Sequence, residues 1–167
     1  MMQLIHEILM DNSHDFFEFK LSDIDPTLNL RQVSINVPDL SGLYLVFCTN
    51  EIKPDCSHLR FQIKGVDYFL IYFGKAGGTT NNGRVLKQGL KGRINNVVSD
   101  SHRNIKDLKR GEYWDLIMRE KGIDHFYISY VQHNSPQILE DMIYSFLDIN
   151  NLTYPYLNKK RGRGKLS

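Results

Sequence analysis

Strand-like and helix-like spacings of apolar residues follow one another along this chain, and each change of spacing marks a predicted element. From Gly42 the run GLYLVF is continuously apolar and rich in β-forming residues, which predicts a buried strand. Residues 59–64 alternate and residues 67–73 are nearly all apolar, so both are expected to be strands, joined by a hairpin turn at KGVD, 64–67. A further strand is predicted over 123–131.

Helical spacing replaces strand spacing in the middle of the chain. Residues 84–98 place five apolar side chains within one arc of a helix, with Arg93 just outside its edge: Leu86, Leu90, Ile94, Val97 and Val98. A second amphipathic helix is predicted over 112–122, ending at Gly122.

The last predicted helix covers residues 135–151, with Ser135 as its N-cap and Pro136 in its first turn. Asp141 points away from the apolar half of this helix, whereas Glu140 lies at its boundary, where a carboxylate can reach into a cleft. An ordinary boundary glutamate is the alternative. The apolar half is predicted to contain Ile138, Leu139, Met142, Ile143, Phe146 and Leu147.

The first forty residues predict a helix followed by extended chain, with a turn at Asp25-Pro26. A length of 167 residues and a hydrophobic content of 41% are typical of one globular domain. Two cysteines are too few for a disulfide-stapled secreted fold, so we expect a cytoplasmic protein with no membrane segment. Cys48, Cys56 and His58 lack the ligand number and spacing of a structural zinc site.

Charge is unevenly distributed although the net charge is only +2. Residues 1–40 contain seven acidic and two basic side chains, while residues 75–110 contain nine basic and two acidic ones. Residues 159–167 add five more basic side chains and no acidic one. Such segregation favours binding to a polyanion such as nucleic acid, although a solvated helix face and a frayed terminus would also account for it.

Five sequence features occur in an order that resembles the GIY-YIG nuclease family. They are SGLY at 41–44, YFGKA at 72–76, LKGRI at 90–94, the helix that contains Glu140, and PYLN at 155–158. Each tripeptide alone would be weak evidence, but the order and spacing together are specific. The resemblance covers residues 40–160 as a nuclease domain, with residues 1–39 as an N-terminal extension and 161–167 as a basic tail.

The resemblance implies an α/β (α+β) domain with a small, mainly antiparallel sheet flanked by helices. It implies a metal-dependent endonuclease that hydrolyses DNA, with Tyr44 as general base and Tyr72 orienting the attacking water. Arg93 would hold phosphate oxygens, Glu140 would bind one Mg²⁺ or Mn²⁺ ion, and Asn158 would complete the site. A phenol titrates near pH 10, and nearby cations are expected to favour the phenolate form of Tyr44.

The residue types suit phosphodiester hydrolysis independently of the family. A single carboxylate is typical of Mg²⁺, which keeps most of its waters, and an arginine fork can grip phosphate oxygens in two places. A restriction-type enzyme is the member of the family that the chain most resembles, and a homodimer is one option for its assembly. The basic side chains predicted to contact DNA are Lys75, Lys87, Lys91, Arg103, Lys159, Lys160, Arg161 and Arg163.

Two departures from the family pattern leave alternatives open. The spacer between Tyr44 and Tyr72 is long, which predicts an inserted hairpin at about 50–66. Many members have a histidine one helical turn after the arginine, where this chain has Val97; His102 is a candidate substitute. A non-catalytic nucleic-acid-binding module that retains the fold is therefore the rival interpretation, and RNA is a second possible substrate.

Overall fold

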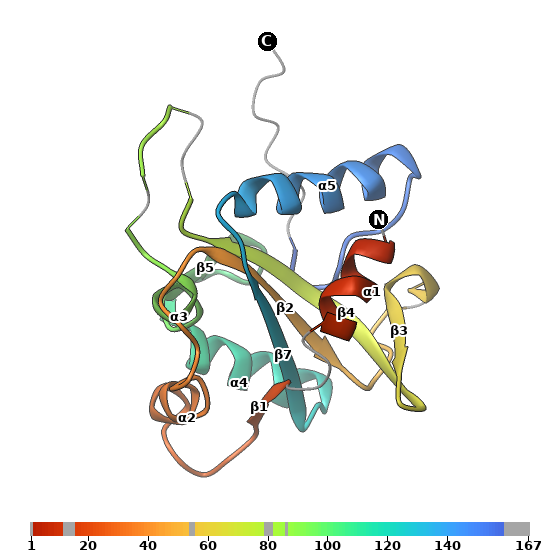
Figure 1. The fold of residues 1–167 in the computed structure, drawn as a ribbon. Helices are drawn as coiled ribbons and strands as arrows, with labels where there is room; N and C mark the ends of the chain where they lie inside the picture. Colours follow the sequence, from red (N-terminus) through yellow and green to blue (C-terminus); the bar gives the residue numbers. More distant parts are fainter. Residues whose placement is uncertain (1, 12–15, 54–55, 79–81, 86, 159–167) are drawn as a thin grey trace.

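A strand that is buried along its whole length, β2 (Gly42–Cys48), forms the centre of the fold. This computed structural model describes residues 2–11, 16–53, 56–78, 82–85 and 87–158. Five antiparallel strands form the main sheet in the order β1-β7-β2-β4-β3 (Figure 1). The flanking strands are β1 (Phe17–Lys20), β7 (His125–Gln132), β4 (Val66–Ala76) and β3 (Arg60–Ile63).

Side chains of β2 alternate between two hydrophobic cores, one on each face of the sheet. Tyr44 and Val46 face a core that contains side chains of α2, α3 and α4, whereas Leu43 and Leu45 face a core shared with α1 and α5 (Figure 1). Helices therefore cover both faces, which explains why β2 is apolar at every position. The helices are α1 (Met2–Asp11), α2 (Pro26–Val33), α3 (Leu90–Ile94), α4 (Arg110–Lys121) and α5 (Pro136–Ile149).

The expectation of an α+β domain with a mainly antiparallel sheet is confirmed. Strand predictions for β2, β3, β4 and β7 are also confirmed, including the hairpin turn, where Lys64 and Gly65 have φ of 51° and 79°. In the long spacer between β2 and β4, a short 3-10 helix, η1 (Ser57–Leu59), precedes the edge strand β3. Within the described part of the chain, no helix is long and apolar enough to span a membrane.

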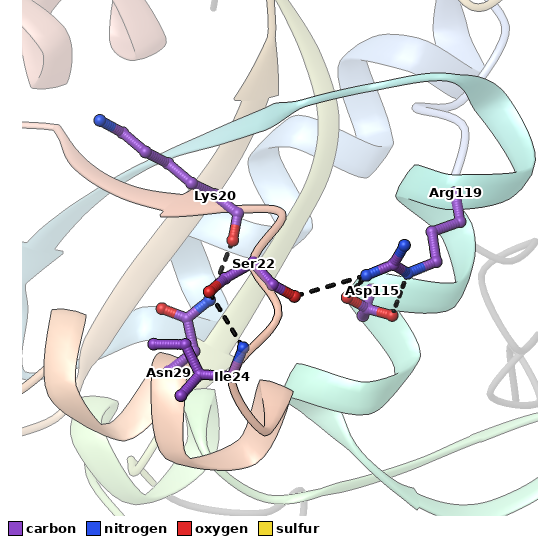
Figure 2. Close-up of polar contacts among 6 residues, drawn as sticks. All are labelled: Lys20, Ser22, Ile24, Asn29, Asp115 and Arg119. Atoms are coloured by element: carbon purple, nitrogen blue, oxygen red, sulfur yellow. Dashed lines mark hydrogen bonds and ion pairs between the residues drawn. The ribbon is translucent and has the colours of Figure 1, made fainter.

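The N-terminal forty residues contribute directly to the sheet, because β1 pairs with β7. The predicted turn at Asp25-Pro26 is instead the start of α2, where the Asp25 carboxylate accepts a hydrogen bond from the Thr27 backbone at 2.9 Å. Figure 2 shows how this corner is held: the Asn29 amide donates to the Lys20 carbonyl at 2.9 Å, and Arg119 of α4 reaches the Ser22 carbonyl at 3.4 Å.

The predicted helix over 84–98 is wrong in its extent. Among the described residues of this stretch, only the five of α3 are helical, and Val97 and Val98 begin a separate hairpin. Asn95 ends the helix, since its side-chain amide donates to the Lys91 carbonyl and to the Ser34 hydroxyl. The β-branched valines then pair with the strand that leads into α4. The hairpin strands are β5 (Val97–Asp100) and β6 (Ile105–Lys109), with a 3-10 turn, η2 (Ser101–Arg103), between them.

The buried face of α5 is narrower than predicted. Leu139, Ile143 and Leu147 are buried against the sheet as expected, but Ile138 and Met142 are 54% and 45% exposed. Phe146 is half-buried against the same core, and α1 covers part of this face with Ile5, Ile8 and Leu9. Ser135 occupies the N-cap position without a side-chain cap, and Pro136 begins the helix as predicted.

The backbones of α4 and α2 approach each other closely at Gly111. A Cβ atom on Gly111 would lie 2.3 Å from the backbone oxygen of Pro26, whereas one on Gly92 of α3 would mainly meet the flexible side chain of Gln88. Alanine normally stabilises a helix relative to glycine. We expect Gly111→Ala to lower the free energy of unfolding by about 1–3 kcal/mol instead, because backbone atoms must move.

Urea denaturation followed by circular dichroism measures this difference. Gly92→Ala is the matched control and is expected to change the free energy of unfolding by less than about 1 kcal/mol. Equal stability of Gly111→Ala and the wild type would contradict the close packing of α4 on α2.

Candidate functional site

The candidate site is built on the part of β4 that extends beyond its edge neighbour. β3 pairs with β4 only from Val66 to Phe69. Beyond Phe69, residues 155–158 lie along β4 in place of a neighbouring strand. The Leu157 backbone N–H donates to the Ile71 carbonyl at 2.8 Å. The Asn158 side chain then imitates a peptide group, accepting from the Phe73 N–H and donating to the Phe73 carbonyl, both at 3.0 Å.

Glu140 of α5 lies at the same edge of β4, beside Lys75, two residues beyond the position that Asn158 occupies at Phe73. Its half-buried carboxylate accepts a hydrogen bond from the Lys75 backbone. Burial raises the pKa of Glu140 above its ordinary value of 4.5, while Lys75 and Arg93 oppose the rise. Asn158 and Glu140 are therefore placed next to each other along β4 by the backbone groups that they satisfy.

A tyrosine pair crosses from β2 to β4 on the opposite side of this strand. Tyr44 is fully buried, and its ring centroid lies 5.6 Å from that of Tyr72. Gly74 is directly opposite Tyr44 in the sheet register, and a Cβ atom there would lie 2.9 Å from the Tyr44 hydroxyl and ring. Glycine at the end of YFG is thus required by the packing of the tyrosine of GLY.

Close packing also explains why the first tripeptide, GLY, begins with a glycine. A Cβ atom on Gly42 would lie 2.2 Å from the backbone oxygen of Val131 in β7. Each tripeptide therefore combines a tyrosine that faces the site with a glycine that permits a close approach of neighbouring chain. These contacts give both short motifs a physical explanation.

Arg110, the first residue of α4, completes the buried part of the site. It is only 4% exposed, and its guanidinium carbon lies 5.7 Å from the Tyr44 ring centroid and 5.8 Å from that of Tyr72. In the sequence, Arg110 is one of nine basic residues between positions 75 and 110. No periodicity or motif distinguishes it, because its burial is decided by the docking of α4 on the sheet.

The Tyr44 hydroxyl is less acidic than the sequence predicted, because the pKa of Tyr44 is raised and not lowered. Burial raises the pKa of Tyr44 well above the usual range, and Tyr72 adds to the rise, while Arg110 and Arg93 lower it. Desolvation therefore outweighs the nearby cations in this structure. At neutral pH the Tyr44 side chain is a phenol, and its oxygen has no hydrogen-bond partner.

Arg93 projects from α3 into a basic cavity beside the tyrosine pair. The cavity has a volume of about 430 Å³, and Arg93 itself is exposed. Arg93 also interacts electrostatically with both Tyr44 and the candidate metal ligand Glu140. The cavity is lined by Lys75, Ala76, Gly77, Arg84, Val85, Lys87, Gln88 and Arg93.

The predicted DNA-contacting residues lie in different parts of the structure. Lys75 and Lys87 line the basic cavity, whereas Lys91 of α3 is not among its lining residues. Arg103 bonds to the buried Asp100 at 2.7 Å and covers the Tyr156 ring, next to Lys53 and Lys121. The remaining four lie outside the described residues: Lys159, Lys160, Arg161 and Arg163.

The candidate histidine substitute is not placed as a helical neighbour of Arg93. α3 ends at Ile94, Val97 is in β5, and His102 is exposed on η2. Tyr144, one helical turn after Glu140, is a further site residue, because its hydroxyl accepts from the Asn158 amide at 3.0 Å. Helical spacing from Glu140 was the signal that could have identified it.

A metal ion at this site would have one protein carboxylate, Glu140. Among the residues that the structure describes, no group of three or more His, Cys, Asp or Glu side chains is arranged to hold a metal. One half-buried carboxylate suits Mg²⁺, which binds proteins through one or two carboxylates and keeps several waters. A cation would also favour the charged form of Glu140, which burial disfavours.

Comparison with known proteins identified no relative of this chain. No protein-family model matches the chain, and neither the curated proteins nor the solved structures give a match. The residues and their geometry therefore carry the functional argument.

Removal of the unpaired hydroxyl at Tyr44 is expected to stabilise the protein. A buried polar group without a partner costs about 1–3 kcal/mol, so Tyr44→Phe should raise the free energy of unfolding by about 1 kcal/mol. Tyr113→Phe is the matched comparison, because the Tyr113 hydroxyl donates to the buried Asp100 at 2.7 Å. Its loss should lower stability by about 1–3 kcal/mol. Denaturant titration of both variants checks the opposite signs; destabilisation by Tyr44→Phe would contradict the unpaired state.

Glu140→Gln is expected to stabilise the protein in a pH-dependent manner. Because burial raises the pKa of Glu140 in the folded state, the wild type loses stability as the pH rises above the ordinary value of 4.5. The variant should therefore be more stable than the wild type at pH 7, with the difference disappearing below about pH 4. Thermal denaturation across this range measures it. Asp141→Asn, at an exposed neighbouring position, is the matched control.

Proposed function

We propose that this chain is a metal-dependent endonuclease that hydrolyses phosphodiester bonds in DNA. The observation that carries the proposal is the gathering of five separated residues around the outer half of β4. Tyr72 lies on this strand, Tyr44 packs against it, and Glu140 and Asn158 bond to its edge. Arg93 faces the same site from α3.

Each part of phosphodiester hydrolysis has a candidate side chain here. The phenolate of Tyr44 would take a proton from the attacking water, whose oxygen then bonds to phosphorus. Tyr72 would orient that water, and Arg93 would hold the phosphate oxygens in the exposed basic cavity. As the bond to the leaving oxygen breaks, that oxygen takes up a proton. Mg²⁺ or Mn²⁺ held by Glu140 would supply a positive charge against the developing negative charge.

The basic side chains around the cavity support a polyanionic substrate. Lys75, Arg84, Lys87 and Arg93 are all among its lining residues. A second group of cations converges on Tyr156, two residues before Asn158. Two such groups on one molecule suit a nucleic-acid strand, whose phosphates are neutralised by lysine and arginine at several points. A cytoplasmic restriction-type enzyme is the form of this activity that we favour.

Burial of the Tyr44 hydroxyl favours the second candidate function, a nucleic-acid-binding module without catalysis. A phenol with a raised pKa is a poor base, and its oxygen is enclosed by neighbouring residues. In this alternative the basic cavity binds nucleic acid and the tyrosines only pack the sheet.

Cleavage of supercoiled plasmid DNA with and without Mg²⁺ or Mn²⁺ tests the two functions against each other. We expect metal-dependent cleavage, reduced by at least about a hundredfold in Glu140→Gln, because the metal ligand is lost. Asp141→Asn, which leaves that ligand in place, should cleave as the wild type does.

Discrete fragments would support a restriction-type enzyme, and a parallel assay with RNA of the same sequence distinguishes the two substrates. Binding of DNA in a chelating buffer without any cleavage in metal would overturn the nuclease and support the binding module. Equal cleavage by wild type and Glu140→Gln would overturn the metal assignment.

A further inference from the structure

A buried cation lies against the two candidate catalytic tyrosines. The Arg110 guanidinium is within 6 Å of both ring centroids, at 5.7 Å and 5.8 Å, and the residue is 4% exposed. Arg93, by contrast, is exposed beside the basic cavity. One arginine therefore faces solvent and the other faces the aromatic interior of the same site.

Arg110 has phenols rather than a carboxylate as its neighbours. The ion pairs found within the described part of the chain join other residues, Glu18 to Lys20, Asp100 to Arg103 and Asp115 to Arg119. The Nε atom of Arg110 has no hydrogen-bond partner. Burial of a charge is unfavourable unless an opposite charge compensates it. In the resting structure this compensation is incomplete.

The groups that could supply the missing negative charge are few. Burial alone would lower the pKa of Arg110, yet Tyr44, Tyr72 and Tyr113 raise it, and Tyr72 does so by a hydrogen bond as well as by its charge. The Tyr44 oxygen is itself buried and unpaired. Around Tyr44, the titratable and charged neighbours are Tyr72 of β4, Tyr130 of β7, Arg93 of α3 and Arg110 of α4.

We propose that Arg110 is a positioning residue that holds the Tyr44 and Tyr72 rings in place and acts as the internal counter-cation of the Tyr44 phenolate. This inference deepens the proposed nuclease function and rests on it for its catalytic meaning. When the Tyr44 hydroxyl releases its proton to solvent, the charge on its oxygen gains a buried cation as its partner. The Tyr44 oxygen, which is buried without a hydrogen-bond partner at rest, then has its charge beside this guanidinium.

The two arginines consequently have separate roles. Arg93 is exposed and free of the aromatic stack, so it suits the substrate phosphate. Arg110 is enclosed by the stack and acts on the reaction through Tyr44. Loss of Arg110 should therefore change the pH at which Tyr44 ionises, whereas loss of Arg119, an exposed arginine in the last turn of the same helix, should not.

Site-specific incorporation of 3,5-difluorotyrosine at position 44 makes this ionisation measurable, because fluorination makes the phenol more acidic than tyrosine. The ¹⁹F chemical shift is followed against pH in the full chain without DNA or metal. We expect the midpoint to rise by at least about one pH unit in Arg110→Met. Arg110→Lys, which keeps a charge but loses the planar fork, should give a smaller rise. Arg119→Met, as the control, should leave the midpoint unchanged.

An unchanged midpoint in folded Arg110→Met or, if that variant does not fold, in the equally uncharged Arg110→Gln would overturn the proposal. The pH profile of DNA cleavage gives a second readout. Arg110→Lys should move the ascending limb of kcat/KM to higher pH, whereas Arg93→Lys should lower kcat/KM at every pH. A uniform loss without a shift in Arg110→Lys would overturn the role of Arg110 in ionisation. If the wild type cleaves no substrate, the nuclease function fails, while the fluorine titration still decides what Arg110 does to Tyr44.

Discussion

Packing of the Tyr44 ring across the bare backbone of Gly74 is the contact on which the site depends. With no Cβ at Gly74, the ring and hydroxyl of Tyr44 can cross from β2 onto β4 and reach Tyr72. The N-terminus of α4 then places Arg110 against both rings. Any larger residue at position 74 would separate the two tyrosines. The missing side chain at Gly74 therefore controls how Tyr44 and Tyr72 lie relative to each other.

Asn158 and Glu140 gain their positions from the other edge of the same strand. β4 is longer than β3, and its uncovered backbone groups need partners. Asn158 satisfies Phe73, and Glu140 accepts from Lys75. Two residues expected to serve catalysis thus also serve as substitutes for a missing strand. This double use fixes a carboxylate and an amide to a rigid element, as preorganised sites require.

Several energetic costs meet at this site, and two further buried unpaired atoms, Thr27 Oγ1 and Gln137 Oε1, lie elsewhere in the described structure. The Tyr44 hydroxyl and the Arg110 Nε atom are buried without partners, and burial disfavours the charge of Glu140. Elsewhere in the described structure a comparable buried carboxylate, Asp100, has three donors, from His102, Arg103 and Tyr113. Functional sites are where a fold retains local instability that it compensates elsewhere, and the contrast with Asp100 supports a function at the tyrosine pair.

Local patterns in the sequence determined most of the elements and many candidate residues, because strand and helix spacing are properties of neighbouring positions. They determined β2, the β3–β4 hairpin, the end of α4 at Gly122 and the start of α5, and they singled out Glu140. Only the tertiary structure decided where α3 ends, which stripe of α5 is covered, and that Arg110 is buried under two tyrosines. The physical reason is that burial and pKa depend on which elements pack together. A basic residue before a helix has the same local sequence whether it faces water or an aromatic pair.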